Sequence, residues 1–335
     1  MKDKFGREIG YLRVAVTDRC NLRCLYCMPE EGVEFKPHPE ILTYEEIERV
    51  IRAAVPLGIT KIRLTGGEPL VRKDLPDFIK KIRSIPGIEE IALTTNGTFL
   101  PKYAYALKEA GLDRVNISLD SLKPERYKEM TRGGDLSKVL RGINLALDLG
   151  LKPVKLNVVV VKGFNDDEVL DFVAFVREKE VHVRFIEFMS IGESRTWKNR
   201  GYVENAQLRE RISLKDQTLT ALSAEEVSVL GNGPAEYYRV QGGLGTIGFI
   251  SPVSNHFCSR CNRLRLTADG KLRPCLLSDR YVDIKTALRS GGSQKTLQDL
   301  IKKTIFSKPE EKEIDQTKPE DEIGPDTAFM SQIGG

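Results

Sequence analysis

Six cysteines, in two groups of three, are the residues of this sequence whose spacing best suits metal chemistry. The groups read C-x3-C-x2-C and C-x2-C-x13-C, and they consist of Cys20, Cys24, Cys27, Cys258, Cys261 and Cys275. Thiols stay reduced in a chain that is not secreted, so metal binding is a better interpretation than a disulfide framework. The separation of the groups predicts two distinct sites.

The first group places three thiolates on one short loop. A cubane iron–sulfur cluster has four irons, so three cysteines leave one iron open to chelate a small molecule through an amine and a carboxylate. Zinc is the alternative, but a structural zinc site needs a fourth protein ligand, and no cysteine or histidine follows Cys27 before His38. The spacing therefore favours a catalytic cluster.

The second group is brought together by a predicted hairpin. Residues 268–271 read Ala-Asp-Gly-Lys, a turn signal that returns Cys275 to the C-x2-C pair. His256 could complete a Cys3His zinc site, so the spacing leaves zinc and an iron–sulfur cluster both open. Arg263 and Arg265 lie two residues apart, on one strand face beside the cysteines. There they could grip phosphate, with ordinary surface charge as the alternative.

The elements that must position these residues follow a regular pattern. Short β-branched runs alternate with helical patterns from residue 11 to about residue 188, which predicts βα units and a largely parallel sheet. Thr43 and Glu46 have the spacing of a capping box and predict the start of one helix. The six expected strands lie near residues 11–17, 60–65, 90–95, 114–119, 154–161 and 182–187.

Several of these strands alternate an apolar face with a polar one. Lys61, Arg63 and Thr65 alternate with isoleucine and leucine, and similar polar stripes run through residues 116–120 and 155–157. A closed eight-stranded barrel fills its interior with Val, Ile and Leu. The stripes therefore predict an incomplete (β/α)6 TIM-type barrel whose lumen holds a charged ligand. An ordinary sheet with one wet face is the alternative, but the glycines and small polar residues at the strand ends favour the barrel.

The βα pattern stops near residue 190. We therefore expect an α/β partial barrel over residues 1–190 and a C-terminal region over residues 191–335 that carries the second cysteine group. Residues 307–326 are rich in Lys, Glu, Asp and Pro and are expected to form a solvated linker.

Composition excludes some classes of function. A net charge of +4 on 30% charged residues is too balanced for a nucleic-acid-binding surface. No apolar run of about eighteen residues suggests a membrane span, and no basic and then apolar segment suggests a signal peptide. The expected location is the cytoplasm.

Three motifs carry a resemblance to known proteins. CNLRCLYC at residues 20–27 resembles the signature of the radical S-adenosylmethionine (SAM) superfamily. TGGEP at residues 65–69 is similar to the glycine-rich strand end that binds the methionine amino group there, and its Glu68 offers a carboxylate for capping or an ion pair. NRLRL after Cys261, with the terminal Gly334 and Gly335, resembles the GTP 3′,8-cyclases, the family that begins molybdenum cofactor biosynthesis.

The resemblance implies two [4Fe–4S] clusters and SAM as cofactors, with the six cysteines as cluster ligands. It implies SAM contacts at Tyr26, Gly67, Ser118 and Met189, and GTP contacts at Arg13, Arg63, Thr94, Lys155, Arg263, Leu264 and Arg265. Catalytic roles are implied for Arg13, Arg263, Arg265, Gly334 and Gly335. The open iron of the second cluster would receive guanine, which leaves His256 free.

The implied reaction begins with reductive cleavage of SAM to a 5′-deoxyadenosyl radical, which takes the hydrogen atom from C3′ of GTP. The carbon radical then attacks guanine C8, and one further electron with a proton completes 3′,8-cyclo-7,8-dihydro-GTP. The resemblance also implies a reducing electron donor, a cyclic pyranopterin monophosphate synthase that receives the product, and a monomer or homodimer.

Two other functions compete with this one. A peptide or sulfatase maturase is also a twin-cluster radical enzyme, but its C-terminal domain usually carries more cysteines than the three found here. A zinc-stabilised binding protein, in which both cysteine groups are structural, is the alternative from a different class.

Overall fold

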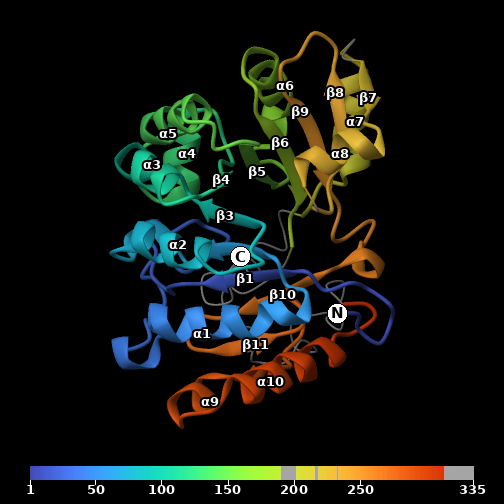
Figure 1. The fold of residues 1–335 in the computed structure, drawn as a ribbon. Coiled ribbons are helices and arrows are strands. Elements are labelled where there is room, and N and C mark those ends of the chain that lie inside the picture. The colour runs from blue at the N-terminus through green and yellow to red at the C-terminus, as the bar shows by residue number, and fades with distance from the viewer. Residues whose placement is uncertain (190–200, 216–217, 232, 313–335) are drawn as a thin grey trace.

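A continuous twelve-stranded sheet organises the chain in the computed structural model, which describes residues 1–189, 201–215, 218–231 and 233–312 (Figure 1). Its strand order is β12-β11-β10-β1-β2-β3-β4-β5-β6-β9-β8-β7. Within the described residues the sheet stays open, because its end strands β12 and β7 do not pair with each other.

The centre of the sheet consists of the six strands that the sequence predicts, all parallel. This arrangement confirms the predicted βα organisation. The six strands are β1 (Tyr11–Ala15), β2 (Lys61–Thr65), β3 (Glu90–Thr95), β4 (Arg114–Ser118), β5 (Lys155–Val160) and β6 (His182–Glu187).

Helices connect the central strands, because two parallel strands can be joined only by a long crossover connection, which is usually a helix. The predicted helix start is confirmed, because Thr43 accepts a hydrogen bond from the backbone N–H of Glu46 while the Glu46 side chain caps the Thr43 N–H. The helices of this part are α1 (Tyr44–Ala54), α2 (Leu75–Arg83), α3 (Leu100–Glu109), α4 (Pro124–Thr131), α5 (Leu136–Asp148) and α6 (Val169–Glu178).

The C-terminal region adds strands to both edges of the same sheet. Strand β9 (Thr246–Ile250) pairs parallel with β6, and β10 (Arg263–Leu266) pairs parallel with β1. Edge strands present unpaired backbone groups, so each addition satisfies one edge of the central sheet. The remaining strands are β7 (Leu219–Ala221), β8 (Glu236–Val240), β11 (Lys271–Arg273) and β12 (Val282–Asp283).

Four more helices accompany these strands, namely α7 (Asn205–Ser213), α8 (Ala224–Leu230), α9 (Lys285–Arg289) and α10 (Gln294–Phe306). Helix α10 packs against α1 on the outside of the sheet (Figure 1). The predicted domain division at residue 190 coincides with the start of 190–200, a segment outside the described residues. Strands from both parts of the chain belong to the same sheet.

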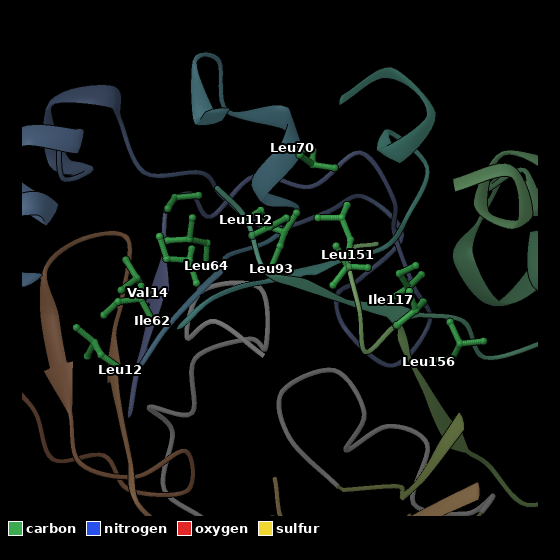
Figure 2. Close-up of a cluster of buried hydrophobic side chains, with 14 of the residues drawn as sticks. Leu12, Val14, Ile62, Leu64, Leu70, Leu93, Leu112, Ile117, Leu151 and Leu156 are labelled. Atoms are coloured by element: carbon green, nitrogen blue, oxygen red, sulfur yellow. The ribbon is translucent and has the colours of Figure 1, made fainter. Parts of the chain in front are cut away.

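The two faces of the central strands differ as their sequence alternation predicts. On one face, Leu12 and Val14 of β1 lie beside Ile62 and Leu64 of β2 in a large buried apolar cluster (Figure 2). The polar residues between them face the opposite side and line a cavity. None of the helices described in the structure is long and apolar enough to span a membrane.

Candidate active site

The first cysteine group lies on the loop that follows β1. The backbone N–H of Cys27 donates to the carbonyl of Cys24 at 2.9 Å, which closes a tight turn. Arg132, at the end of α4, donates to the carbonyl oxygens of Arg23 at 3.1 Å and Met28 at 2.9 Å. The loop is therefore braced from outside while its cysteines face the cavity.

The two glycines of the TGGEP motif let the end of β2 pack directly against the cysteine loop. A Cβ atom on Gly67 would lie 2.3 Å from the carbonyl oxygen of Arg19, and one on Gly66 would lie 2.4 Å from that of Thr17. Backbone hydrogen bonds from Gly67 to Thr17 (2.9 Å) and from Glu68 to Arg19 (2.8 Å) complete this contact. The close backbone approach expected from these glycines is therefore made to the loop that carries Cys20.

Glu68 of the same motif acts as a buried cap. Its carboxylate accepts hydrogen bonds from Thr95 Oγ1 and the backbone N–H of Asn96, both at 2.7 Å, and from the Leu70 N–H at 3.1 Å. Burial raises the pKa of Glu68 to about 7, against the opposing effect of these donors. The carboxylate thus ties the ends of β2 and β3 together beneath the first cysteine group.

The second cysteine group is assembled by the hairpin that the sequence predicts. Strands β10 and β11 pair antiparallel, and Gly270 in their turn has φ +84°, a left-handed conformation that suits glycine. The carboxylate of Glu187, at the end of β6, accepts hydrogen bonds from the backbone N–H groups of Val253 (3.0 Å) and Ser254 (2.9 Å). This contact holds the segment that leads into Cys258.

Both cysteine groups line one cavity of about 360 Å³. The cavity also contains the predicted SAM contacts and most of the predicted GTP contacts. The predicted residues that line it are Arg13, Cys20, Cys24, Tyr26, Cys27, Arg63, Gly67, Thr94, Ser118, Lys155, Met189, Cys258, Cys261, Arg263, Arg265 and Cys275. The structure therefore brings together two sites that lie more than two hundred residues apart in the sequence.

A row of arginines crosses the floor of this cavity. Arg13 of β1 is in register with Arg63 of β2 on one side and with Arg265 of β10 on the other. Adjacent strands lie about 4.8 Å apart, so the three arginine side chains extend from neighbouring backbone positions. Burial, together with the charges of Arg265 and Arg63, lowers the pKa of Arg13 well below its ordinary value. Such a row attracts a polyanion.

Further cations extend the row along the other strands. Burial and the charges of Arg184 and Arg114 lower the pKa of Lys155, which is only 1% exposed. Lys61, Arg114 and Arg184 also line the cavity, although no motif of the sequence marks them as site residues. The signal that could have found Arg114 and Arg184 is the alternation with period two, which places them on the polar faces of β4 and β6.

Buried polar atoms without partners show that the cavity suits a polar ligand. The hydroxyl of Tyr11, Nε of Arg63 and Oγ1 of Thr94 are buried and have no hydrogen-bond partner among the described residues. Burying a polar group without a hydrogen-bond partner costs free energy, so we expect these atoms to bind a ligand or water. A nucleoside triphosphate supplies the acceptors that they lack.

A hydrogen bond joins Tyr26 and Asp120 beside the first cysteine group. Tyr26 donates a hydrogen bond to Asp120 at 2.9 Å, and burial followed by the Asp120 charge raises the pKa of Tyr26 well above its ordinary value. Burial also raises the pKa of Asp120, to about 6, while its hydrogen bonds from Val159 and Tyr26 oppose this change. The Tyr26 phenol is therefore held neutral beside Cys24 and Cys27.

Leu264 is the one predicted site residue of the described part of the chain that does not line the cavity. Leu264 of β10 is fully buried in the apolar cluster, because it alternates with Arg263 and Arg265, so only its backbone could contact GTP. Gly334 and Gly335 lie outside the described residues.

Each cysteine triplet offers three thiolates to the same cavity. In a cubane cluster each thiolate binds a different iron, so three cysteines can ligate three of its four irons. The two triplets therefore fit such clusters.

Comparisons with known proteins agree along the whole chain. Residues 14–176 match the radical SAM superfamily, and residues 181–314 match the family Molybdenum Cofactor Synthesis C. The GTP 3′,8-cyclase of Pelotomaculum thermopropionicum is 52% identical and that of Alkaliphilus oremlandii 50% identical, each over 335 residues and 100% of both chains. The chain belongs to the GTP 3′,8-cyclase family. As a GTP 3′,8-cyclase it is a radical SAM enzyme, and its cofactors are iron–sulfur clusters and SAM.

Solved structures with low sequence identity share the fold of this cyclase. The structure of Streptococcus suis SuiB bound to S-adenosylmethionine has a TM-score of 0.56 and 13% identity, and it covers 88% of this chain and 66% of SuiB. Native anSMEcpe with bound AdoMet has a TM-score of 0.55 and 16% identity, and it covers 90% of this chain and 81% of that protein. The expected α/β radical SAM architecture is therefore confirmed.

Proposed function

We propose that this GTP 3′,8-cyclase holds its SAM-binding cluster at Cys20, Cys24 and Cys27 and its second cluster at Cys258, Cys261 and Cys275. The reaction converts GTP to 3′,8-cyclo-7,8-dihydro-GTP, the first step of molybdenum cofactor biosynthesis. The observation that carries the residue assignment is that both triplets and the arginine row line the same cavity.

The end of the cavity at the first triplet suits SAM. Gly67 keeps the end of β2 against the cysteine loop, and Tyr26, Ser118 and Met189 lie around the same space. When bound, the reduced cluster and SAM supply the radical that abstracts a hydrogen atom from the substrate. The chain's own part there is to orient SAM and to exclude water.

The other end of the cavity suits GTP. Arg13, Arg63 and Arg265 form a continuous row that can bind the triphosphate through forked, charge-assisted hydrogen bonds. Thr94 of β3 and Lys155 of β5 add a hydroxyl and an amine to the same cavity. Arg263 lies beside Cys261 and carries the positive charge next to the second triplet. Anchoring the triphosphate in this way fixes the ribose between the two triplets.

The remaining assignments concern the tail, partners and location. We assign Gly334 and Gly335 a catalytic contribution at the cavity, because the resemblance implies it and glycine is the slimmest residue. A reducing electron donor and a downstream cyclic pyranopterin monophosphate synthase complete the proposed pathway. A reducing cytoplasm, the proposed location, would keep six thiols available for iron.

The test is anaerobic incubation with GTP, SAM and reductant, followed by mass analysis for a cyclised isomer of GTP. The protein should be brown and hold about eight irons for two cubane clusters. Replacing Cys258, Cys261 and Cys275 with Ala should leave about four irons and abolish cyclisation. Full iron content in that variant would refute the assignment of the second cluster.

A further inference from the structure

A buried ion pair near the start of the chain takes no part in the chemistry proposed above. Arg7 Nε donates to Asp3 Oδ2 at 2.6 Å, and the two side chains are 6% and 0% exposed. Asp3 Oδ1 also accepts the backbone N–H groups of Phe5 (2.9 Å) and Arg7 (3.0 Å). The carboxylate therefore fixes the orientation of the Arg7 guanidinium.

The other side of that guanidinium joins two distant segments. Arg7 Nη1 donates to the carbonyl oxygen of Cys258 at 2.8 Å and to that of Glu310 at 3.0 Å, and Nη2 donates to that of Pro309 at 2.6 Å. A planar fork with five donors can serve Asp3 and three carbonyls at once, whereas a lysine ammonium cannot. One side chain thus ties Cys258 to the segment 308–310 that follows α10.

The same segment reaches the other end of the second triplet. Lys308, which is 3% exposed, donates from Nζ to the carbonyl oxygens of Pro274 at 2.7 Å and Arg263 at 3.0 Å. Pro274 immediately precedes Cys275. Residues 308–310 therefore connect the two ends of the second triplet. Arg7 links them to Cys258, and Lys308 links them to the residue before Cys275.

We propose that Arg7, oriented by Asp3, is a positioning residue for the second cysteine triplet. Arg7 contacts Cys258 and residues 308–310, and through these contacts it fixes the position of Cys258 relative to Cys275. The β10–β11 hairpin by itself holds Cys275. The inference rests on the proposed function, because it requires that this triplet hold an iron–sulfur cluster. Loss of the fork leaves three partly buried carbonyls without this donor, so the Cys258 loop loses one of its anchors while the hairpin stays.

The experiment compares iron retention at each triplet separately in the full-length protein. One background carries Cys20→Ala, Cys24→Ala and Cys27→Ala, so that only the second triplet can hold iron. The other background carries alanines at Cys258, Cys261 and Cys275. Each receives Arg7→Lys or Asp3→Asn, and the rate of iron transfer to a ferrous chelator is followed anaerobically, together with the electron paramagnetic resonance spectrum of the reduced protein.

Arg7→Lys should speed iron loss from the second triplet about 10-fold and alter its spectrum, and leave the first triplet unchanged, since one or two charge-assisted hydrogen bonds are lost. Asp3→Asn, which keeps the guanidinium but loosens its orientation, should give a smaller change in the same direction. Arg52→Lys is the matched control, because Arg52 forms an exposed ion pair on α1, and it should have no effect.

Other outcomes overturn the proposal in distinguishable ways. Equal iron-loss rates for Arg7→Lys and the parent at the second triplet would remove Arg7 from its positioning role. Equal acceleration at both triplets would make Arg7 a general stability residue. Absence of iron from the second triplet in the unmodified background would instead refute the proposed cluster site, whatever the result at Arg7.

Discussion

Arg13 and Arg265 occupy the same register position on the adjacent parallel strands β1 and β10, although 251 residues separate them in the sequence. Both side chains are buried, at 9% and 7% exposure. Burial and the neighbouring charge of Arg263 lower the pKa of Arg265 to about 10. Two buried positive charges on adjacent strands favour binding of a polyanion such as GTP. Removing one of them tests this proposal.

Arg265→Ala should weaken GTP binding roughly 10- to 100-fold, because it removes hydrogen bonds from a charged donor to a charged ligand. Reductive cleavage of SAM without GTP should continue at the parent rate, since the first triplet lies on the loop after β1. Affinity can be measured by anaerobic equilibrium dialysis with GTP. Arg52→Ala, on the exposed surface of α1, is the control. Unchanged GTP affinity for Arg265→Ala would remove this residue from the site.

Gly67→Ala should disrupt the first site selectively. Its Cβ would lie 2.3 Å from the carbonyl oxygen of Arg19, and because that oxygen belongs to the backbone, the cysteine loop must move. Overpacking of this kind costs about 1–3 kcal/mol, so we expect SAM affinity to fall at least about 10-fold while the second triplet retains its iron.

The control for this change is Gly10→Ala, whose Cβ would make an ordinary contact of 3.5 Å with the carbonyl oxygen of Gly58. SAM affinity can be followed by the spectral change that SAM causes in the reduced protein. Parent-like SAM binding in Gly67→Ala would contradict the requirement for close approach between β2 and the loop.

His182 predicts a pH dependence of stability. Its Nδ1 contacts Thr246 Oγ1 at 2.9 Å, and burial, followed by the charges of Lys155 and Arg184, lowers its pKa from 6.5 to about 4. Between these values the unfolded chain takes up a proton that the folded chain does not. The contribution of His182 is therefore complete above pH 6.5 and is lost as the pH falls toward 4.

His182→Gln should remove this part of the pH dependence. Between pH 7.5 and pH 5.5 the parent should lose about 1 kcal/mol more unfolding free energy than the variant. Anaerobic denaturant titration at both pH values measures the difference. Parallel losses in the two proteins would show that His182 is protonated equally well in the folded and unfolded states.

Deletion of Gly334 and Gly335 should separate cluster assembly from catalysis. We expect the truncated protein to keep the iron content and SAM affinity of the parent and to lose most of its cyclisation rate, at least about 10-fold, if the tail enters the cavity to position a reacting group. Single-turnover assays with GTP measure the rate. A variant that replaces both glycines with serine keeps the length of the chain. It tests whether cyclisation requires residues without side chains at these two positions. Full activity of the truncated protein would refute the role of the tail.

Local patterns in the sequence were sufficient for much of this fold, whereas the expected SAM and GTP contacts came from the family resemblance. Cysteine spacing, the turn at residues 268–271 and the period of two along each strand depend on near neighbours, so they predicted the six central strands and the β10–β11 hairpin. The same period explains why Arg263 and Arg265 face the cavity while Leu264 is buried.

The tertiary structure alone decided which distant strands became neighbours. The sequence predicts a C-terminal region after residue 190 but not where its strands pair, and in the structure β9 and β10 extend the two edges of the central sheet. Register between strands such as β1 and β10 depends on long-range packing and edge pairing, which no short segment encodes. That pairing places Arg265 beside Arg13, and the contacts of Arg7 and Lys308 bring residues 308–310 under the second triplet. The sequence determined which residues could do chemistry, and the packing of distant segments determined which of them meet.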